Sequence, residues 1–440
     1  MRDQAKAVGV SRRAVVAGMG ASLFAPAVRA AGEKVVRLWS QFDPSSARDP
    51  REKVLAKLIA GFEAENPGVR IVAEPQNWVQ MTDKFFAAHR TGTAPDIMTV
   101  LYHRMPTAID MGALANLDEL MAANKLLTAD DYADMAGPYQ DYGMKDGAHY
   151  QIEHSRSVAG ITYHTDMFKA AGLNPADITT WDDFLAAAQA LTVKNGSQVS
   201  RYGFAQVFTV TANQPSIAAS IMMDQNGTLF HKDGKANFSN PAGIKGMTFE
   251  TDLIRKYNVA PASAISLSGE DLYDVFTSGR AAMILSNSGR IARLRGILKS
   301  DEVDYLPFPS FTKGKASPTE AQGWPFTIWS RSKVKDEAAK FLAYISSKAA
   351  DKMWVTEGGT IPIRKSTVTE NPDFFKDPAK GYIVRVGDVM QKSVWFVPKT
   401  PIGGWNEELD RSAQAIIGNG VEVEAALQRA EKNYDGANGY

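Results

Sequence analysis

The sequence predicts an α/β protein, in which sheets are covered by helices. From Glu33 onwards short apolar segments alternate with amphipathic helices, the pattern of strands joined by crossover helices. The composition is that of a folded protein, with 44% hydrophobic and 22% charged residues. A length of 440 residues is enough for two or three domains with buried cores.

The first elements follow this pattern. Apolar residues recur at spacings of three and four between residues 51 and 65, which predicts a helix that buries Leu55, Leu58 and Phe62. The turn Asn66-Pro67-Gly68 ends this helix. Strands are expected at 35–39, 69–73 and 97–101.

The same alternation continues in the second half of the chain. Thr180 and Asp183 are spaced as a capping box, which predicts that a helix begins at Trp181 and extends to Leu191. The other expected elements are strands at 158–163 and 281–285 and helices at 166–171, 271–278 and 336–347.

The first 30 residues read as an export signal rather than as part of the fold. Arg12 and Arg13 precede a weakly apolar run that is too short to cross a bilayer, and small residues follow it. The segment 11–16 also resembles the twin-arginine signature. We expect cleavage after Ala30, or alternatively after Ala27; the remaining alternative is a basic terminus before a first helix.

Charge and cysteine content exclude several classes of function. The chain has 49 basic and 49 acidic side chains, so no long-range field attracts nucleic acid or an anionic membrane. It has no cysteine, which excludes disulfides, thiol catalysis, cysteine-based metal sites and lipidated cysteine. We therefore expect a soluble periplasmic protein without a lipid anchor, and no nucleic-acid partner.

Seven short motifs occur along the chain. They are FEAENPGV at 62–69, GTAPDI at 92–97, LANLD at 114–118, ITYHTDMF at 161–168, TWDDF at 180–184, FTSGRAAM at 276–283 and GTIPIR at 359–364. In this order they resemble the motifs of the large extracellular solute-binding proteins that deliver sugars to bacterial ABC importers, the group that contains maltose-binding protein. The resemblance covers most of residues 33–420, although His164 stands where the family usually has asparagine.

The resemblance implies a two-lobed periplasmic binding protein fold of type II, in which each lobe has a mostly parallel sheet flanked by helices. Two or three crossing segments form the hinge, and the ligand lies between the lobes. Carried onto this chain, the topology implies one lobe from 33–154 and 286–324 and another from 155–285 and 325–440. It further implies a monomer that binds a carbohydrate and delivers it to the permease subunits of an ABC transporter.

Candidate ligand contacts follow the predicted strands, because ligands of open α/β sheets lie beyond the carboxyl ends of strands. Sugars need aromatic faces and planar polar side chains within a concave pocket. Trp39 and Gln41 follow the first strand, and Trp78 follows the second. The alternatives are packing of Trp39 at the sheet edge and of Trp78 on the next helix.

His103 and Arg104 follow the third strand, where the family commonly places polar contacts. A guanidinium suits paired hydroxyls or an anion, whereas His103 could equally be a solvated loop residue. Ser155 and Ser157 share one face of a polar crossing segment. Asn287 ends a strand before a helix and could bind ligand or only cap that helix.

Two further candidates come from the family resemblance. Trp324 lies at the last expected crossing, a position where the family often stacks a sugar, and Arg364 matches the arginine of the Pro-x-Arg turn. Together these ten residues are the expected ligand contacts. We expect no catalytic residue, no metal ligand and no cofactor.

An enzyme is the main alternative class, because an aromatic cleft also suits a secreted carbohydrate-active enzyme. The chain has no Gly-x-Ser-x-Gly elbow, zinc-protease helix or phosphate loop, and its histidines lack metal-ligand spacing. A sugar sensor for a chemoreceptor would use the same fold and stays open. The sequence also leaves open whether the sugar is neutral or anionic.

Overall fold

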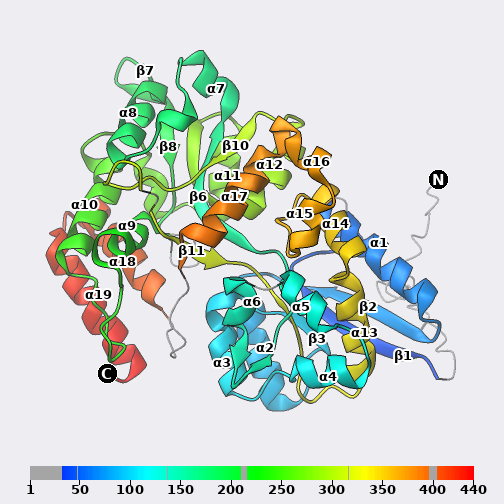
Figure 1. The fold of residues 1–440 in the computed structure, drawn as a ribbon. Helices are drawn as coiled ribbons and strands as arrows, with labels where there is room; N and C mark the ends of the chain where they lie inside the picture. Colours follow the sequence, from blue (N-terminus) through cyan, green and yellow to red (C-terminus); the bar gives the residue numbers. More distant parts are fainter. Residues whose placement is uncertain (1–31, 47, 136, 210–215, 316, 396–403) are drawn as a thin grey trace, which may run out of the picture.

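The computed structural model describes residues 32–440 except residues 47, 136, 210–215, 316 and 396–403. The expected signal segment, 1–30, lies outside the described residues, so its processing stays a prediction. The described chain forms two bodies, each with a sheet and covering helices, joined by extended segments (Figure 1). This confirms the predicted α/β, two-lobed fold class.

The first lobe contains a four-stranded sheet in the order β12-β3-β1-β2. The strands β1, β2 and β3 are parallel, and β12 is antiparallel to β3. Its elements are β1 (Lys34–Ser40), α1 (Pro50–Glu65), β2 (Val69–Pro75), α2 (Met81–Thr91), β3 (Ile97–Thr99), α3 (Met105–Asp110), α4 (Leu117–Ala123), α5 (Ala129–Met135), α6 (Pro138–Tyr142), the hairpin β4 (Met144–Lys145) and β5 (Ala148–His149), β12 (Phe326–Ile328), α13 (Lys335–Ile345) and α14 (Lys348–Thr356).

The second lobe contains a seven-stranded sheet in which β10 also pairs with β6. Its elements are β6 (Ser157–His164), α7 (Thr165–Ala170), α8 (Trp181–Leu191), β7 (Val193–Asn195), β8 (Gln198–Ala205), α9 (Ile217–Asn226), α10 (Pro241–Arg255), α11 (Gly269–Thr277), β9 (Ala281–Asn287), α12 (Ile291–Leu298), β10 (Val303–Leu306), β11 (Thr319–Gln322), α17 (Gly381–Lys392), β13 (Val394–Trp395), α18 (Trp405–Asn419) and α19 (Val423–Asn438). The short helices α15 (Lys365–Thr369) and α16 (Pro372–Lys376) connect α14 to α17.

The strand directions in the second sheet differ from the expectation of a mostly parallel sheet. β6 is antiparallel to β9, β10 and β11, whereas β8 runs parallel to β9 and β11 runs parallel to β13. Every residue of β6 is buried, so its apolar sequence predicts a central strand. The sequence does not indicate whether that strand runs parallel or antiparallel to its neighbours.

The expected lobe boundaries also require correction. Ile152 bridges to Phe326 of the first lobe and β6 begins at Ser157 in the second, so the chain first crosses near residues 153–157. Residues 286–322 nevertheless stay with the second lobe, because β10 and β11 both pair with β6. Residues 326–356 return to the first lobe, where β12 pairs with β3 and α13 packs on β12 and α4. The second crossing is therefore near 322–325, and a third lies between α15, which packs on α5 of the first lobe, and α17.

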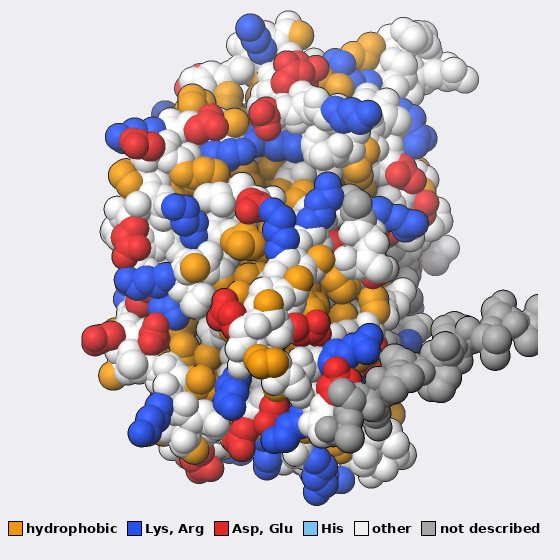
Figure 2. Space-filling model, turned by 90° about the vertical axis from the view of Figure 1, so that its right-hand side faces the viewer, with side chains coloured by type: hydrophobic (Ala, Val, Ile, Leu, Met, Phe, Trp, Pro, Cys, Tyr) orange, Lys and Arg blue, Asp and Glu red, His pale blue; other side chains and the backbone are white. Residues whose placement is uncertain are grey.

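Each lobe buries its own apolar faces. In the first lobe Leu55, Leu58 and Phe62 of α1 are buried, as the helical spacing predicts. In the second lobe Trp181 is fully buried at the start of α8, where Thr180 and Asp183 form the predicted capping box. Figure 2 shows basic and acidic side chains interspersed over one face, without a large patch of one sign.

Candidate functional site

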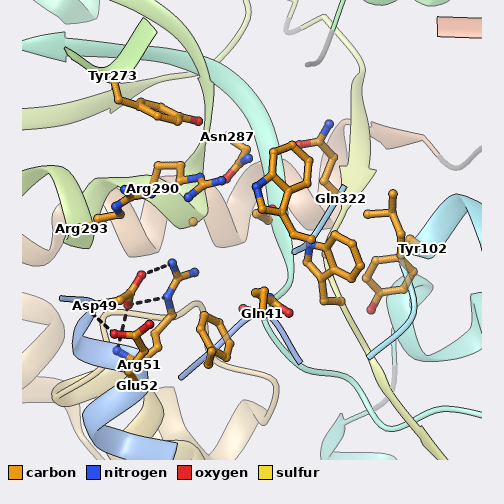
Figure 3. Close-up of a pocket in the computed structure, with 18 of the residues that line it drawn as sticks. Gln41, Asp49, Arg51, Glu52, Tyr102, Tyr273, Asn287, Arg290, Arg293 and Gln322 are labelled. Carbon is orange, nitrogen blue, oxygen red and sulfur yellow. Dashed lines mark hydrogen bonds and ion pairs between the residues drawn. The ribbon is translucent and has the colours of Figure 1, made fainter. Parts of the chain in front are cut away.

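A cavity of about 290 Å³ lies where the two lobes meet at the crossing segments. Figure 3 shows side chains of the two lobes facing each other across it. One side presents Tyr273, Asn287, Arg290 and Arg293, and the other presents Gln41, Asp49, Arg51 and Glu52.

The loop after β1 supplies a polar side chain, Gln41, that is hydrogen-bonded to β3. Gln41 lines the cavity, and the hydroxyl of the buried Thr99 donates to its side-chain oxygen at 3.2 Å. Phe42 is buried beside it, and the Arg51 guanidinium lies 4.8 Å from the centroid of the Phe42 ring. The Gln41 side chain is therefore positioned by Thr99 at the end of β3.

The N-terminus of α1 reaches the cavity through a capping box. Asp49 accepts from the backbone N–H of Arg51 at 2.9 Å, and Glu52 accepts from the backbone N–H of Asp49 at 3.1 Å. The Arg51 side chain donates to both carboxylate oxygens of Asp49, at 2.9 and 2.5 Å. Burial alone would raise the pKa of Asp49, but the charge and hydrogen bonds of Arg51 outweigh it and lower that pKa.

Aromatic residues line much of the first-lobe wall. Trp78 follows β2 and is half-buried, and Tyr102 follows β3 and is buried, with its ring 5.2 Å from that of Tyr139 in an edge-on contact. His103 lines the cavity next to Tyr102. Burial, with the charge of Arg104, lowers the pKa of His103 to about 4, so this ring is neutral at pH 7.

The crossing segments form the floor of the cavity. Ser155 has a positive φ of 51°, and Gly323 of the opposite segment has a φ of 150°. Ser155, Ser157, Gln322 and Trp324 all line the cavity. The hinge therefore presents hydroxyls, an amide and a half-buried indole to the space between the lobes.

The second-lobe wall carries an arginine-rich turn. Arg290 ends the 3₁₀ turn Ser288–Arg290 that follows β9, and Arg293 lies in the first turn of α12. Arg293 donates to both carboxylate oxygens of Glu270, at 3.3 and 2.8 Å. Arg290 lies 5.1 Å from the ring centroid of Tyr273 and 5.9 Å from that of Trp78, which belongs to the other lobe.

Glu320 of β11 lies at the bottom of the cavity and is 9% exposed. Burial raises the pKa of its carboxyl to about 8, against a smaller opposite effect of the hydrogen bond with Gln322. At pH 7 this group is mainly protonated, so it can donate as well as accept a hydrogen bond.

The cavity contains seven of the ten predicted contact residues. These are Gln41, Trp78, His103, Ser155, Ser157, Asn287 and Trp324. Each lies at the end of a strand, shortly after a strand or in a crossing segment. Whether they touch a ligand stays a prediction.

Trp39 and Arg104 lie outside the cavity, contrary to expectation. The Trp39 indole N–H donates at 2.7 Å to Glu74, which pairs with Trp39 across β1 and β2. The indole therefore has its hydrogen-bond partner within the sheet, on β2 next to the interior strand β1. The Arg104 guanidinium donates at 2.8 Å to Asp83 and lies over the ring of Phe86, 5.1 Å from its centroid.

Arg364 does not line the cavity either, and it is held by contacts within the first lobe. Its side chain is 1% exposed and forms ion pairs with Asp131 at 3.0 Å and Asp134 at 3.1 Å. It also donates to the backbone carbonyl of Ser346 at 2.7 Å. The arginine of the Pro-x-Arg turn therefore binds the α14–α15 connection to α5 and does not face the ligand space.

Sequence reasoning missed the charged and polar groups that complete the walls. They are Arg48, Asp49, Arg51, Glu52, Glu270, Tyr273, Arg290, Arg293, Glu320 and Gln322. Asp49, Pro50 and Glu52 have the residue types and spacing of a helix start, a local signal that the apolar spacing did not include. Only the tertiary arrangement brings this helix end opposite α12.

The described ranges contain no group of three or more histidine, aspartate or glutamate residues placed to hold a metal ion. Within the same ranges, no helix combines the length and apolarity needed to span a membrane.

Two curated proteins are similar to this chain over long segments. The putative ABC transporter periplasmic-binding protein YcjN of Escherichia coli (strain K12) is 23% identical over 333 residues, which cover 75% of this chain and 74% of that protein. The arabinooligosaccharide-binding protein of Bacillus subtilis (strain 168) is 27% identical over 219 residues, which cover 49% of this chain and 48% of that protein.

A solved structure has the same fold. The ABC substrate-binding protein Lmo0181 from Listeria monocytogenes, in complex with cycloalternan, matches with a TM-score of 0.76 at 20% identity. The match covers 93% of this chain and all of that one.

The sequence profile of bacterial extracellular solute-binding proteins matches residues 48–352, well over half of the chain. The chain therefore belongs to the family of bacterial extracellular solute-binding proteins.

Proposed function

We propose that this protein is the substrate-binding component of an ABC importer and that it captures a sugar, a polyol or a sugar derivative between its lobes. The observation that carries the proposal is the composition of the cavity between the lobes. Half-buried indoles from Trp78 and Trp324 accompany the amides of Gln41, Asn287 and Gln322. Aromatic faces suit the C–H surface of a sugar, and amides suit its hydroxyls.

The position of these groups also supports capture by closure. Trp78 belongs to the first lobe and Asn287 to the second, while Trp324 lies on a crossing segment. A ligand that contacts all three favours the arrangement in which the lobes are close, because only that arrangement makes all the contacts. The loaded form then differs in shape from the empty form, and the permease subunits can distinguish the two.

The family and the sequence support a location outside the cytoplasm. We infer that the protein is exported, soluble and periplasmic, that it carries no lipid anchor, and that it is a monomer. The absence of cysteine supports the lack of a lipid anchor. Cell fractionation, with the mass of the exported protein, tests this: the expected N-terminus is Ala31, and a membrane-bound product would contradict it.

Thermal unfolding with a panel of mono- and oligosaccharides tests the function. A ligand that binds only the native state stabilises by RT ln(1 + [L]/Kd), about 2.7 kcal/mol at 100 times Kd. The expected result is a higher melting temperature with particular sugars, which are recovered unchanged from the mixture. Consumption of the sugar would instead indicate the enzyme, and stabilisation by peptides alone would contradict a carbohydrate-binding role.

A further inference from the structure

The Arg290 guanidinium approaches an aromatic ring from each lobe. Its side chain is 19% exposed and lies between Tyr273 of the second lobe and Trp78 of the first. Contacts with two aromatic faces orient a guanidinium without using its N–H groups. The Arg290 side chain is therefore largely removed from water, and these ring contacts leave its N–H groups able to donate hydrogen bonds to another partner.

Two other partly buried arginines of the cavity, one from each lobe, already have carboxylate partners. Arg51 donates twice to Asp49, and Arg293 donates twice to Glu270. The carboxylate oxygen of Glu270 nearest to Arg290 is 3.9 Å away, beyond hydrogen-bonding distance. Among the described residues, no hydrogen bond joins the Arg290 side chain to a protein acceptor.

Arg290 differs from the other two arginines because the nearby carboxylates are engaged elsewhere. Asp49 and Glu270 each accept hydrogen bonds from another arginine, and Glu52 accepts from the backbone N–H groups of Asp43 and Asp49. Glu270 comes no closer to Arg290 than 3.9 Å. A carboxylate or phosphate group on a ligand would supply the hydrogen-bonded counter-charge that these residues do not.

We propose that Arg290 binds an anionic substituent of the ligand and that the ligand is a sugar or polyol carrying one carboxylate or phosphate group. A planar guanidinium binds either group through two parallel hydrogen bonds. A neutral hydroxyl pair would also accept these bonds, but it would leave the mostly buried guanidinium without a hydrogen-bonded counter-charge. This inference rests on the proposed function and specifies its ligand class.

Isothermal titration with matched pairs of ligands tests the inference. The pairs are glucose with glucuronate, galactose with galacturonate, and glycerol with glycerol 3-phosphate. The expected result is that an acidic member binds at least about 30-fold more tightly than its neutral partner. The pair that responds distinguishes a carboxylate ligand from a phosphate ligand. Binding of the neutral members with equal or higher affinity would overturn the inference while leaving the proposed function standing.

Two variants locate the effect at Arg290. Arg290→Gln should lower the affinity for the acidic ligand at least about 30-fold. Arg290→Lys should lower it less, but it should not restore the wild-type affinity, because lysine lacks the planar fork of arginine. Lys299→Gln removes the same charge from an exposed position just after α12 and should leave affinity unchanged. The unfolding temperature of each empty variant shows whether it is folded. Unchanged binding by a folded Arg290→Gln would overturn the inference, and failure of every acidic and neutral member to bind would contradict the proposed function as well.

Discussion

Gly323 lies directly against the backbone of Ser155, so that the two crossing segments touch at the floor of the cavity. A Cβ atom at Gly323 would come within 3.0 Å of the Ser155 carbonyl oxygen and of the Arg156 Cα, and within 2.7 Å of the Tyr102 ring. The hinge segments are therefore packed closely enough that only glycine fits this position.

Replacement of Gly323 by alanine should destabilise the protein by about 2 kcal/mol or more, because a positive φ and a backbone clash act together. Equilibrium unfolding in urea measures the loss. Gly314→Ala is the matched control, because Gly314 also has a positive φ but no atom lies within 4 Å of its added Cβ. Equal losses in both variants would show that close packing of the crossing segments contributes nothing.

Trp324→Ala should lower the affinity for the sugar by about 10- to 100-fold, because a stacked aromatic face is lost. The sugar used is the one that stabilises the wild-type protein. Titration calorimetry measures the change. Trp39→Ala removes an indole of the same size that lies outside the cavity and donates to Glu74. Equal weakening in the two variants would contradict a direct role of Trp324 in binding.

Arg364→Ala should reduce stability and leave ligand affinity unchanged. Its removal leaves the carboxylates of Asp131 and Asp134 without their buried cation, which costs about 3–5 kcal/mol. Lys348→Ala, which breaks the exposed pair with Glu370, should cost less than about 1 kcal/mol. A folded Arg364→Ala protein with much weaker ligand binding would instead place Arg364 in the site.

Glu320 should make the protein less stable as the pH rises. Burial raises its folded-state pKa to about 8 from an ordinary 4.5, so the folded protein holds a proton that the unfolded chain releases. The stability from this group is fully present below pH 4.5 and is lost as the pH rises towards 8, by about 3 kcal/mol between pH 5 and pH 8.

The isosteric variant Glu320→Gln separates this effect from the other titrating groups. Urea unfolding of both proteins between pH 5 and pH 8 measures their free energies of unfolding. As the pH rises, the free energy of unfolding of the variant should increase relative to that of the wild type. A constant difference across this range would mean that Glu320 titrates normally.

The sequence predicted local elements well because their signals are local. The capping box at Thr180 and Asp183 gave the start of α8, and the spacing of Leu55, Leu58 and Phe62 gave the buried face of α1. The return of the chain to the first lobe could not be predicted in this way. Only pairing with β3 shows where the short strand Phe326–Ile328 belongs, and its three buried residues fit either sheet.

Residues that line the cavity were predictable where they follow or end a strand, as for Gln41 and Asn287. Trp39 does not line the cavity, and its neighbour across the sheet, Glu74, accepts a hydrogen bond from it that sequence spacing does not show. Arg290 was missed because its importance depends on tertiary neighbours. Trp78 and Tyr273 approach it from opposite lobes, and the nearest carboxylate is out of hydrogen-bonding reach.

Energy transfer between the lobes tests the central claim most directly. The native chain has no cysteine, so Lys84→Cys in α2 together with Lys194→Cys in β7 places one label on an exposed position of each lobe. Transfer efficiency should change with sugar and saturate at the concentration that saturates calorimetric binding, with the sugar recovered intact. An unchanged efficiency at a concentration that saturates binding would contradict capture by closure of the lobes.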